Sequence, residues 1–313
     1  LKVFSQSTHN HIRNDSLASV TRLIFQGEGS QENPFLIINE NDMKTLSSLV
    51  LQNVETAGVY FKVFYAENEF DLTIDGLNYM PIGDQNYAFR GIFDGNGAIF
   101  EVDIEKASNY VGLFGRTENN ASIKDLTVKG SVKGLMYSGG IVGHNHGSLD
   151  NVANFADIEG TSFVGGISGY HKGEINDSYN KGEISSSGTY TGGVIGYSET
   201  DSTISYSYNM AEINTTGQYV GGIVGHNKSG SLITYSFNHG NINSTAANVG
   251  GIAGNNEGEI KSAYNTGNLQ TTSSIIGGIA AKNSGDIEFV YHGGYIVGTD
   301  YSAGVASMNT GSI

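Results

Sequence analysis

Hydrophobic positions between residue 111 and the C-terminus recur at a nearly constant spacing. They lie in one short motif, an aliphatic cluster flanked by glycines, such as Gly-Gly-Ile-Val-Gly at 139–143 and again at 221–225. Successive copies of the motif are 26 to 29 residues apart, measured between their aligned glycines. Those glycines are Gly112, Gly140, Gly166, Gly193, Gly222, Gly251, Gly278 and Gly304. A period in the twenties is typical of a stacked repeat, in which each unit buries its apolar side against its neighbours.

Two more aliphatic positions in each repeat surround a Tyr-Asn pair or a variant of it. In the copy built on Asn209, Ile204 lies five residues before the Asn and Ile213 lies four residues after it. Three aliphatic positions separated by Gly, Asn, Ser and Asp predict three short strands per turn, joined by bends. A helical repeat is disfavoured, because no repeat shows apolar spacing of three and four. Each of the 45 glycines would also cost roughly 1 kcal/mol in a helix interior.

The predicted fold is all-β: a right-handed parallel β-helix (a solenoid) of about eight regular repeats, preceded by irregular coils and one short capping helix. One residue of each motif is expected to point into the core, namely Leu113, Ile141, Ile167, Val194, Ile223, Ile252, Ile279 and Val305. Because side chains alternate along a strand, the next residue of each motif is expected to point outward. That outer row is Phe114, Val142, Ser168, Ile195, Val224, Ala253, Ala280 and Ala306.

The chain divides into three predicted parts. Residues 1–26 form a lead with little signal, residues 27–110 an N-terminal cap with irregular first coils, and residues 111–313 the regular repeats. The first residue is Leu, and Ile313 falls in the middle of a predicted turn. We therefore expect the natural protein to continue into additional domains beyond residue 313.

The cap contains the one good helical pattern, over residues 39–51, which Asn39 or Asn41 can begin. Its apolar face is Met43, Leu46 and Val50. A short amphipathic helix ahead of a solenoid is expected to cover the first open coil. Further on, Asp94-Gly95-Asn96-Gly97 lies between apolar runs and predicts a tight turn.

Composition narrows the classes of partner. The formal net charge is −15, which argues against nucleic acid and anionic membranes. The chain has no cysteine, so disulfides and Cys-ligated metals are excluded. No hydrophobic segment approaches 18 residues, and we expect no membrane insertion in this part of the protein.

Motifs of catalysis are missing from the sequence. It contains no His-Glu-x-x-His, no Gly-x-Ser-x-Gly and no P-loop. His144 and His146 carry two imidazoles, but residues two apart on a strand rarely chelate a metal alone. A group of acidic residues, which we expect to be solvated rather than to bind Ca²⁺, is Asp94, Glu101, Asp103, Glu105 and Asp125. We predict no catalytic residue, no metal ligand and no cofactor.

The repeat resembles the GLUG repeat of bacterial surface proteins. The resemblance rests on Gly-Gly-Ile-Val-Gly-His-Asn at 221–227, on Gly-Glu-Ile at 173–175 and on Tyr-Asn-Lys-Gly-Glu-Ile at 179–184. Asn33-Pro34-Phe35 and the Phe-x-Gly-x-Phe-Asp-Gly-Asn-Gly run at 89–97 are similar to the segment that precedes such repeats. The resemblance implies an extracellular or bacterial cell-surface location. It also implies a place in filamentous adhesin-like proteins or in the non-catalytic part of immunoglobulin A-cleaving metallopeptidases.

Two classes of function fit these observations. The first is a non-catalytic, adhesin-like module that projects from the cell surface or binds a host or neighbour-cell protein or glycan. The second is a polysaccharide-active lyase or hydrolase. Enzymes on this scaffold need long irregular loops to build a cleft, and the near-constant repeat length favours the first class. Ice binding would need a flat threonine array, and we expect no threonine column in register.

Two sets of residues are candidates for a role in the repeats. The asparagines are predicted to form a hydrogen-bonded structural ladder along the axis, and they are Asn154, Asn180, Asn209, Asn238 and Asn265. The aromatic residue before each is expected to stack in a core row. The predicted ligand-binding residues, on the outward face of the glycine motif, are His144, Tyr170, Ile195, Tyr197, Val224 and His226.

Overall fold

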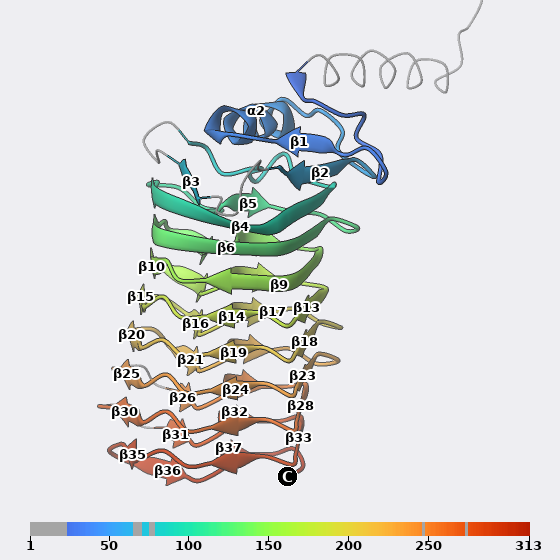
Figure 1. The fold of residues 1–313 in the computed structure, drawn as a ribbon. Helices are drawn as coiled ribbons and strands as arrows, with labels where there is room; N and C mark the ends of the chain where they lie inside the picture. Colours follow the sequence, from blue (N-terminus) through green and yellow to red (C-terminus); the bar gives the residue numbers. More distant parts are fainter. Residues whose placement is uncertain (1–23, 65–70, 75–78, 246–247, 273–274) are drawn as a thin grey trace, which may run out of the picture.

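The protein is a parallel β-solenoid of about ten turns with one helix at its N-terminal end, as Figure 1 shows. The computed structural model describes residues 24–64, 71–74, 79–245, 248–272 and 275–313, and only the backbone of 71–74. Most of the predicted lead, residues 1–23, lies outside the described residues. The predicted fold class is confirmed. The coils begin well before the first glycine motif, because strands near residues 35, 60 and 92 already pair in parallel.

The N-terminal coils hold the longest strands. These elements are β1 (Phe35–Ile37), α2 (Glu40–Leu51), β2 (Tyr60–Val63), β3 (Asp71–Ile74), β4 (Ile92–Glu105), β5 (Phe114–Arg116) and β6 (Ser122–Lys133). Helix α2 lies over the first coil (Figure 1) and buries Met43, Leu46 and Val50, as predicted. Asn39 caps it: its side-chain oxygen accepts from the Asp42 N–H at 3.2 Å, and the Asp42 carboxylate accepts from the Asn39 N–H at 3.2 Å.

The largest sheet contributes three short strands to each regular coil, which stack in three columns. The first column is β9 (Ser148–Asn154), β13 (Glu174–Asn176), β18 (Thr203–Ser205), β23 (Leu232–Thr234), β28 (Glu259–Lys261) and β33 (Asp286–Glu288). The second is β14 (Tyr179–Asn180), β19 (Tyr208–Asn209), β24 (Phe237–Asn238), β29 (Tyr264–Asn265) and β34 (Tyr291–His292), which continue the end of β9. The third is β10 (Asp157–Gly160), β15 (Ile184–Ser186), β20 (Ile213–Thr215), β25 (Ile242–Ser244), β30 (Leu269–Thr271) and β35 (Ile296–Val297).

Two further sheets meet at the glycine motif and close each coil. The sheet before the motif is β7 (Met136–Gly139), β11 (Ser162–Gly165), β16 (Tyr190–Gly192), β21 (Tyr219–Gly221), β26 (Asn248–Gly250), β31 (Ile275–Gly277) and β36 (Tyr301–Ala303). The sheet after it is β5, β8 (Val142–Asn145), β12 (Ser168–His171), β17 (Ile195–Ser198), β22 (Val224–Asn227), β27 (Ala253–Asn256), β32 (Ala280–Asn283) and β37 (Ala306–Asn309).

A regular coil is therefore built from more strands than the predicted three. One reason is a bend between the first and second columns, where a single residue takes a left-handed conformation, as Tyr206 does at φ 48°. A second bend falls at the glycine motif. The three aliphatic positions are nevertheless all buried, because the bends change the backbone direction without turning Ile204, Ile213 or Ile223 away from the core.

The predicted inward column is confirmed. The side chains from Leu113 to Ile279 in that column are fully buried, and Val305 in the last coil is partly buried against the same core. The predicted tight turn at 94–97 is wrong. These residues form an irregularity inside β4, where the register with β6 shifts between Asp94 and Ala98 while both strands keep their direction. Asn96 and Gly97 have positive φ there, so the motif bends a strand and does not reverse it.

Candidate functional site

The glycine motif makes a sharp corner between two sheets. In the motif at 221–225, a Cβ on Gly222 would lie 2.2 Å from the Gly251 carbonyl oxygen, and one on Gly221 would lie 2.0 Å from the Val224 carbonyl oxygen. Neither position leaves room for a side chain. A Cβ on Gly225 would lie 2.7 Å from the Thr191 backbone nitrogen of the previous coil. The three glycines therefore let the strands before and after the corner lie against each other.

At this corner, the residues predicted to form an outward-facing row point into the core instead. Ile195 and Val224 are fully buried, as are Phe114, Val142 and Ser168. Alternation of side chains holds only along a continuous strand. Here the inward Ile or Val of the motif lies at the bend, and the next residue begins a new strand that again points inward. Ile195 and Val224 are therefore core residues, and the prediction that they contact a ligand is wrong.

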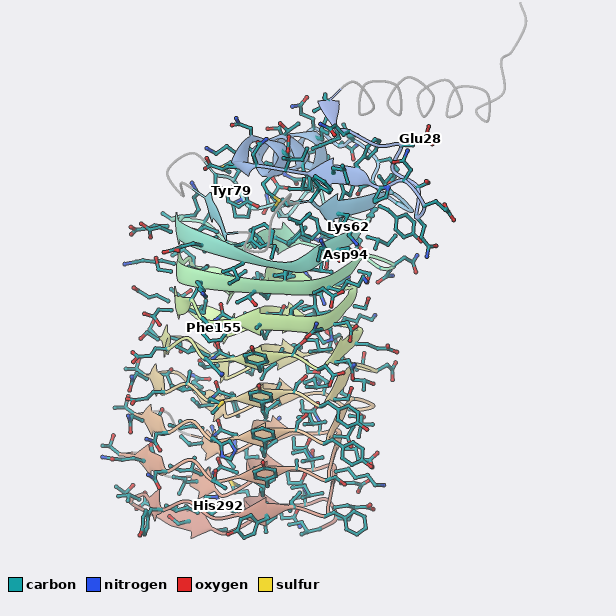
Figure 2. The ribbon with its side chains drawn as sticks, viewed as in Figure 1. Glu28, Lys62, Tyr79, Asp94, Phe155 and His292 are labelled. Carbon is teal, nitrogen blue, oxygen red and sulfur yellow. The ribbon has the colours of Figure 1, made fainter. Side chains whose placement is uncertain are left out.

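The other four predicted ligand-binding residues gather on the outer side of this corner. Figure 2 shows the side chains of the coils stacked above one another. Aromatic and histidine rings from the two sheets form what we call the aromatic strip: Tyr110, Tyr137, Phe163, Tyr190 and Tyr219 on one side, and His144, Tyr170, Tyr197 and His226 on the other. All are half-buried except His226, which is 8% exposed. The first side was not predicted.

Rings of the strip stack along the axis and also meet across the corner. His144 and Tyr170 have ring centroids 4.2 Å apart and planes 4° apart, and Tyr170 and Tyr197 are 5.5 Å and 9° apart. Across the corner, Tyr190 and Tyr197 meet edge to face at 5.1 Å. Because neighbouring coils cover the ring faces, the strip presents ring edges, which carry partial positive charge, and phenol hydroxyls.

Several of those hydroxyls are unpartnered. Tyr170 donates to Glu199 at 2.7 Å. Within the described part of the chain, no protein group bonds to the hydroxyls of Tyr137, Tyr190, Tyr197 and Tyr219. Burial raises the pKa of Tyr137, Tyr190 and Tyr197, so these groups remain protonated donors at neutral pH. The strip thus presents free phenol donors on three of four neighbouring coils, and the coil of Phe163 and Tyr170 lacks one.

The histidines of the strip are neutral near pH 7. Burial lowers the pKa of His144 to about 3 and also lowers that of His226, although Glu257 lies 3.0 Å from the His226 Nε2. Charges of both signs lie beside the rings. Lys228 pairs with Glu257 at 2.7 Å, and the Lys282 ammonium lies 5.4 Å from the Tyr219 ring centroid.

The asparagines of the predicted ladder bond to one another along the axis. Each side-chain amide donates to the carbonyl oxygen of the next Asn side chain, at 2.8 Å from Asn154 to Asn180, 2.9 Å from Asn180 to Asn209, and 2.8 Å for the following two bonds. Asn265 then meets the His292 ring at 2.9 Å. All five asparagines are fully buried.

A second ladder was not predicted, and it lies directly behind the strip. Asn227 donates to Asn256 at 2.8 Å, Asn256 to Asn283 at 2.7 Å, and Asn283 to Asn309 at 2.8 Å. In earlier coils the same position holds Asn145 and His171, which meet at 2.9 Å. These residues immediately follow the strip residues on the second sheet, so the ladder fixes the strands that carry the rings. The recurring Asn three residues after the motif's last aliphatic residue was the available signal.

The aromatic row beside the first ladder is stacked but is not part of the core. Tyr179, Tyr208, Phe237 and Tyr264 lie with ring centroids 4.7 to 5.0 Å apart and planes within 8°. Each ring is half-buried on the outside of the largest sheet, so the expected core position is wrong. In Figure 2, Phe155 lies near the upper end of this row of rings. The Asn that follows each aromatic residue points inward, and strand alternation turns the ring outward.

A threonine column does recur in register, against the prediction. Thr215 pairs with Ser244, which pairs with Thr271, and the exposed residues Thr216 and Thr245 follow them. Thr215, Ser244 and Thr271 are 29 and 27 residues apart, and the glycine motifs of the same coils have the same spacing. The recurrence of these residues could therefore have been predicted from the sequence. Thr215, Thr216, Ser244 and Thr245 line a shallow, open depression of about 910 Å³ together with Asn214 and Asn243. Because Ser244 stands between Thr215 and Thr271 in the paired column, the threonines do not form the continuous array that ice binding needs.

The predicted acidic group is divided between two places. Asp94 and Asp125 lie 3.6 and 3.2 Å from the Lys124 ammonium. Asp103 and Glu105 instead border a shallow groove whose other acidic residues are Asp157, Glu159 and Glu183. Lys133 lies in that groove, 3.2 Å from Glu159. Among the described residues, no three His, Asp or Glu side chains are placed to hold one metal ion.

Comparison with known proteins supports the solenoid architecture and does not indicate an activity. No family model matches the chain. It is 32% identical over 137 residues to a protein of Evansella cellulosilytica described as a "Putative Gly-rich membrane protein". The match covers 41% of this chain and 15% of that protein, so the chain corresponds to a small part of its relative.

A solved structure shares the fold. It is described as "a putative immunoglobulin A1 protease from Bacteroides ovatus", with a TM-score of 0.64 and 19% identity. The alignment covers 88% of this chain and 86% of that one. Identity this low shows a common solenoid and nothing about activity. In the described residues, no helix combines the length and apolar character needed to span a bilayer.

Proposed function

We propose that the protein is a non-catalytic, adhesin-like module of a bacterial surface or secreted protein, and that it binds an extended glycan along the aromatic strip. The observation that carries this proposal is a set of phenol hydroxyls, on Tyr137, Tyr190, Tyr197 and Tyr219, to which none of the described residues bonds. They lie on three of four neighbouring coils of the rod, and two of them, on Tyr190 and Tyr197, lie on the same coil. A polymer with regularly spaced hydroxyl or carbonyl oxygens can accept from several of them at once.

The setting of the proposal comes from the resemblance and the comparisons. The repeats resemble the GLUG repeat of bacterial surface proteins, one relative is described as a membrane protein, and the solenoid neighbour is described as a protease. A β-helical region without catalytic residues, inside a larger surface protein, is compatible with all three. The half-buried rings of the strip lie along the axis on the outer side of the corner, so a ligand aligned with the axis would contact several coils.

The test removes the donors and keeps the rings. Tyr190→Phe, Tyr197→Phe and Tyr219→Phe in one variant should weaken glycan binding about a hundredfold, since each lost hydrogen bond is worth about 1 kcal/mol. Binding is measured on an array of neutral and acidic polysaccharides and then by calorimetry. The melting temperature should change little, because no group in the described part of the chain bonds to these hydroxyls.

The matched control carries the same change on another face of the rod. Tyr179→Phe, Tyr206→Phe and Tyr208→Phe remove three hydroxyls from the largest sheet and should leave affinity unchanged. Equal affinity of the strip variant and the wild type would overturn the proposal. So would binding of a protein partner alone, with no polysaccharide retained on the array.

A further inference from the structure

One position in each regular coil is left-handed and carries its side chain outward, beside the stacked aromatic row. In successive coils it is held by Asp177, Tyr206, Tyr235, Ser262 and Phe289, with φ between 47° and 54°. The strands before it pair in register from β13 to β33, so these residues lie above one another along the axis. Three are aromatic, and Ser262 interrupts them.

Ser262 leaves one ring missing from a stack. Tyr206 and Tyr235 are stacked, with ring centroids 5.0 Å apart and planes 9° apart. The next ring, Phe289, is two coils from Tyr235, which corresponds to roughly 10 Å at the usual strand spacing. That separation leaves room for one more ring between them. Tyr235 is 56% exposed and Phe289 is 77% exposed, so both rings are accessible to a ligand.

The neighbouring aromatic row is interrupted at the same height. Phe237 covers one face of Tyr264 at 5.0 Å. Tyr291, the next member of that row, lies instead against Gly293, where a Cβ would come within 2.6 Å of the Tyr291 hydroxyl. A pocket of about 480 Å³ results, and it is lined by Ser262, Ala263, Tyr264, Thr266, Phe289 and Tyr291. We call this pocket, with Tyr235 above it, the ring slot.

The ring slot has apolar walls and a polar edge. Its lining combines aromatic rings with the hydroxyl-bearing residues Ser262 and Thr266, and the Thr266 hydroxyl bonds to the His239 ring. The residues just before Ser262 and Phe289 are Lys261 and Glu288, which form an ion pair at 3.2 Å. A ligand that matches this arrangement has apolar faces and hydrogen-bonding groups around its rim. A pyranose ring has C–H groups on its faces and hydroxyls at its edge, whereas an aromatic side chain such as Phe leaves the polar edge unused.

We propose that the ring slot binds a single sugar ring of a glycan, held between Phe289 and the tyrosines of the two stacked rows. The slot lies on the largest sheet and shares no residue with the aromatic strip. This inference therefore stands or falls separately from the proposed function.

The decisive variant fills the slot. Ser262→Tyr supplies the missing ring at a left-handed position that Tyr206 and Tyr235 already occupy with the same residue. It should extend the stack, raise the melting temperature and weaken sugar binding at least tenfold. Asp177→Tyr is the matched control, because it adds a ring at the other end of the same column, next to Tyr206, and leaves the slot open.

The measurement is saturation-transfer NMR, followed by calorimetric titration, with a panel of neutral and N-acetylated oligosaccharides. Wild type, Asp177→Tyr and the strip variant with three Tyr→Phe changes should bind the same member of the panel through the slot. Ser262→Tyr should not. If Ser262→Tyr does not fold, Phe289→Ala removes an exposed wall and should show the same loss. The proposal would be overturned if Ser262→Tyr, or Phe289→Ala where Ser262→Tyr does not fold, bound the oligosaccharide as well as the wild type does. It would also be overturned if the wild type bound aromatic peptides but no oligosaccharide.

Discussion

At the scale of single residues, Asn209 shows how a buried amide holds a coil in place. Its carbonyl oxygen accepts from the Asn180 amide at 2.9 Å and from the Ala211 N–H at 3.2 Å. Its own amide donates to the Ala211 carbonyl at 2.9 Å and to the Asn238 side chain at 2.8 Å. All four hydrogen-bonding positions of the amide are therefore used in a fully buried site. Such a residue joins three coils and closes a turn in its own.

Replacing Asn209 should therefore lower the free energy of unfolding strongly. Asn209→Ala leaves the Ala211 N–H and carbonyl without their side-chain partner, and it removes one of the two hydrogen bonds made by the Asn180 amide and by the Asn238 oxygen. Each buried polar group left without a partner costs about 1–3 kcal/mol. We expect a loss of about 3–5 kcal/mol in the free energy of unfolding, measured by urea denaturation. Asn214→Ala, at a half-exposed position in the next strand, should cost less than about 0.5 kcal/mol. Similar losses for the two variants would show that the ladder does not contribute to stability.

At the scale of the structural element, each coil is defined by its bends as much as by its strands. The glycine corner turns two successive residues, such as Ile223 and Val224, into the same core. The left-handed bend before the second column lets the side chains there project outward. Between these bends, short strands keep regular parallel pairing with the coils above and below. The bends therefore decide which faces of the rod carry rings.

In the second ladder, His171 stands in place of an asparagine, and this makes the stability of its coil depend on pH. Burial lowers the pKa of His171 to about 3. The unfolded chain binds a proton near pH 6.5, whereas the folded chain does not until the pH is far lower. The stabilising contribution is therefore complete above about pH 6.5 and is lost as the pH falls towards 3, at about 1.4 kcal/mol per pH unit.

His171→Asn isolates this effect, because Asn stands at the same position in β8 and β22. The variant should lose less stability than the wild type between pH 6.5 and pH 4.5, as measured by urea midpoints at each pH. The many carboxylates titrate in both proteins, so the difference reports the histidine alone. Parallel pH profiles would mean that His171 does not remain neutral in the folded protein.

At the scale of the whole molecule, the chain is a rod with repeated surfaces and short connections. Many of the described carboxylates lie beside lysines, as Glu159 does beside Lys133. The formal net charge of −15 spreads over this surface and opposes self-association. A row of equivalent groups along an axis suits repeated weak contacts with a polymer. Catalysis instead needs a few groups concentrated at one place.

We accordingly expect no depolymerising activity from this part of the protein. Purified protein incubated with pectin, alginate, hyaluronan or peptidoglycan, with and without Ca²⁺, should release no new reducing ends and no unsaturated products. A known lyase or hydrolase for each polymer serves as the positive control. Turnover that disappears in Asp157→Asn or Glu159→Gln would place an active site in the acidic groove and contradict this expectation.

The sequence alone was sufficient for the architecture. The 26- to 29-residue steps predicted a stacked β-helix, and the inward column through Ile223 and the helix capped at Asn39 were both found as expected. These features follow from local chemistry repeated in every coil: glycine where the backbone is crowded, an aliphatic residue in the core, and a capping residue before a helix. Repetition makes such a signal visible, because the same constraint appears again at each step.

Only the tertiary structure decided what the surface carries. It moved Ile195 and Val224 into the core, joined Tyr190 to Tyr197 across the corner, and showed that Ser262 leaves a gap between Tyr235 and Phe289. Periodicity tells which positions recur but not which way they point, since side-chain direction at a bend depends on backbone dihedrals that no spacing encodes. The distance between two rings further depends on how coils stack, which the chain settles only once every coil has folded against its neighbours.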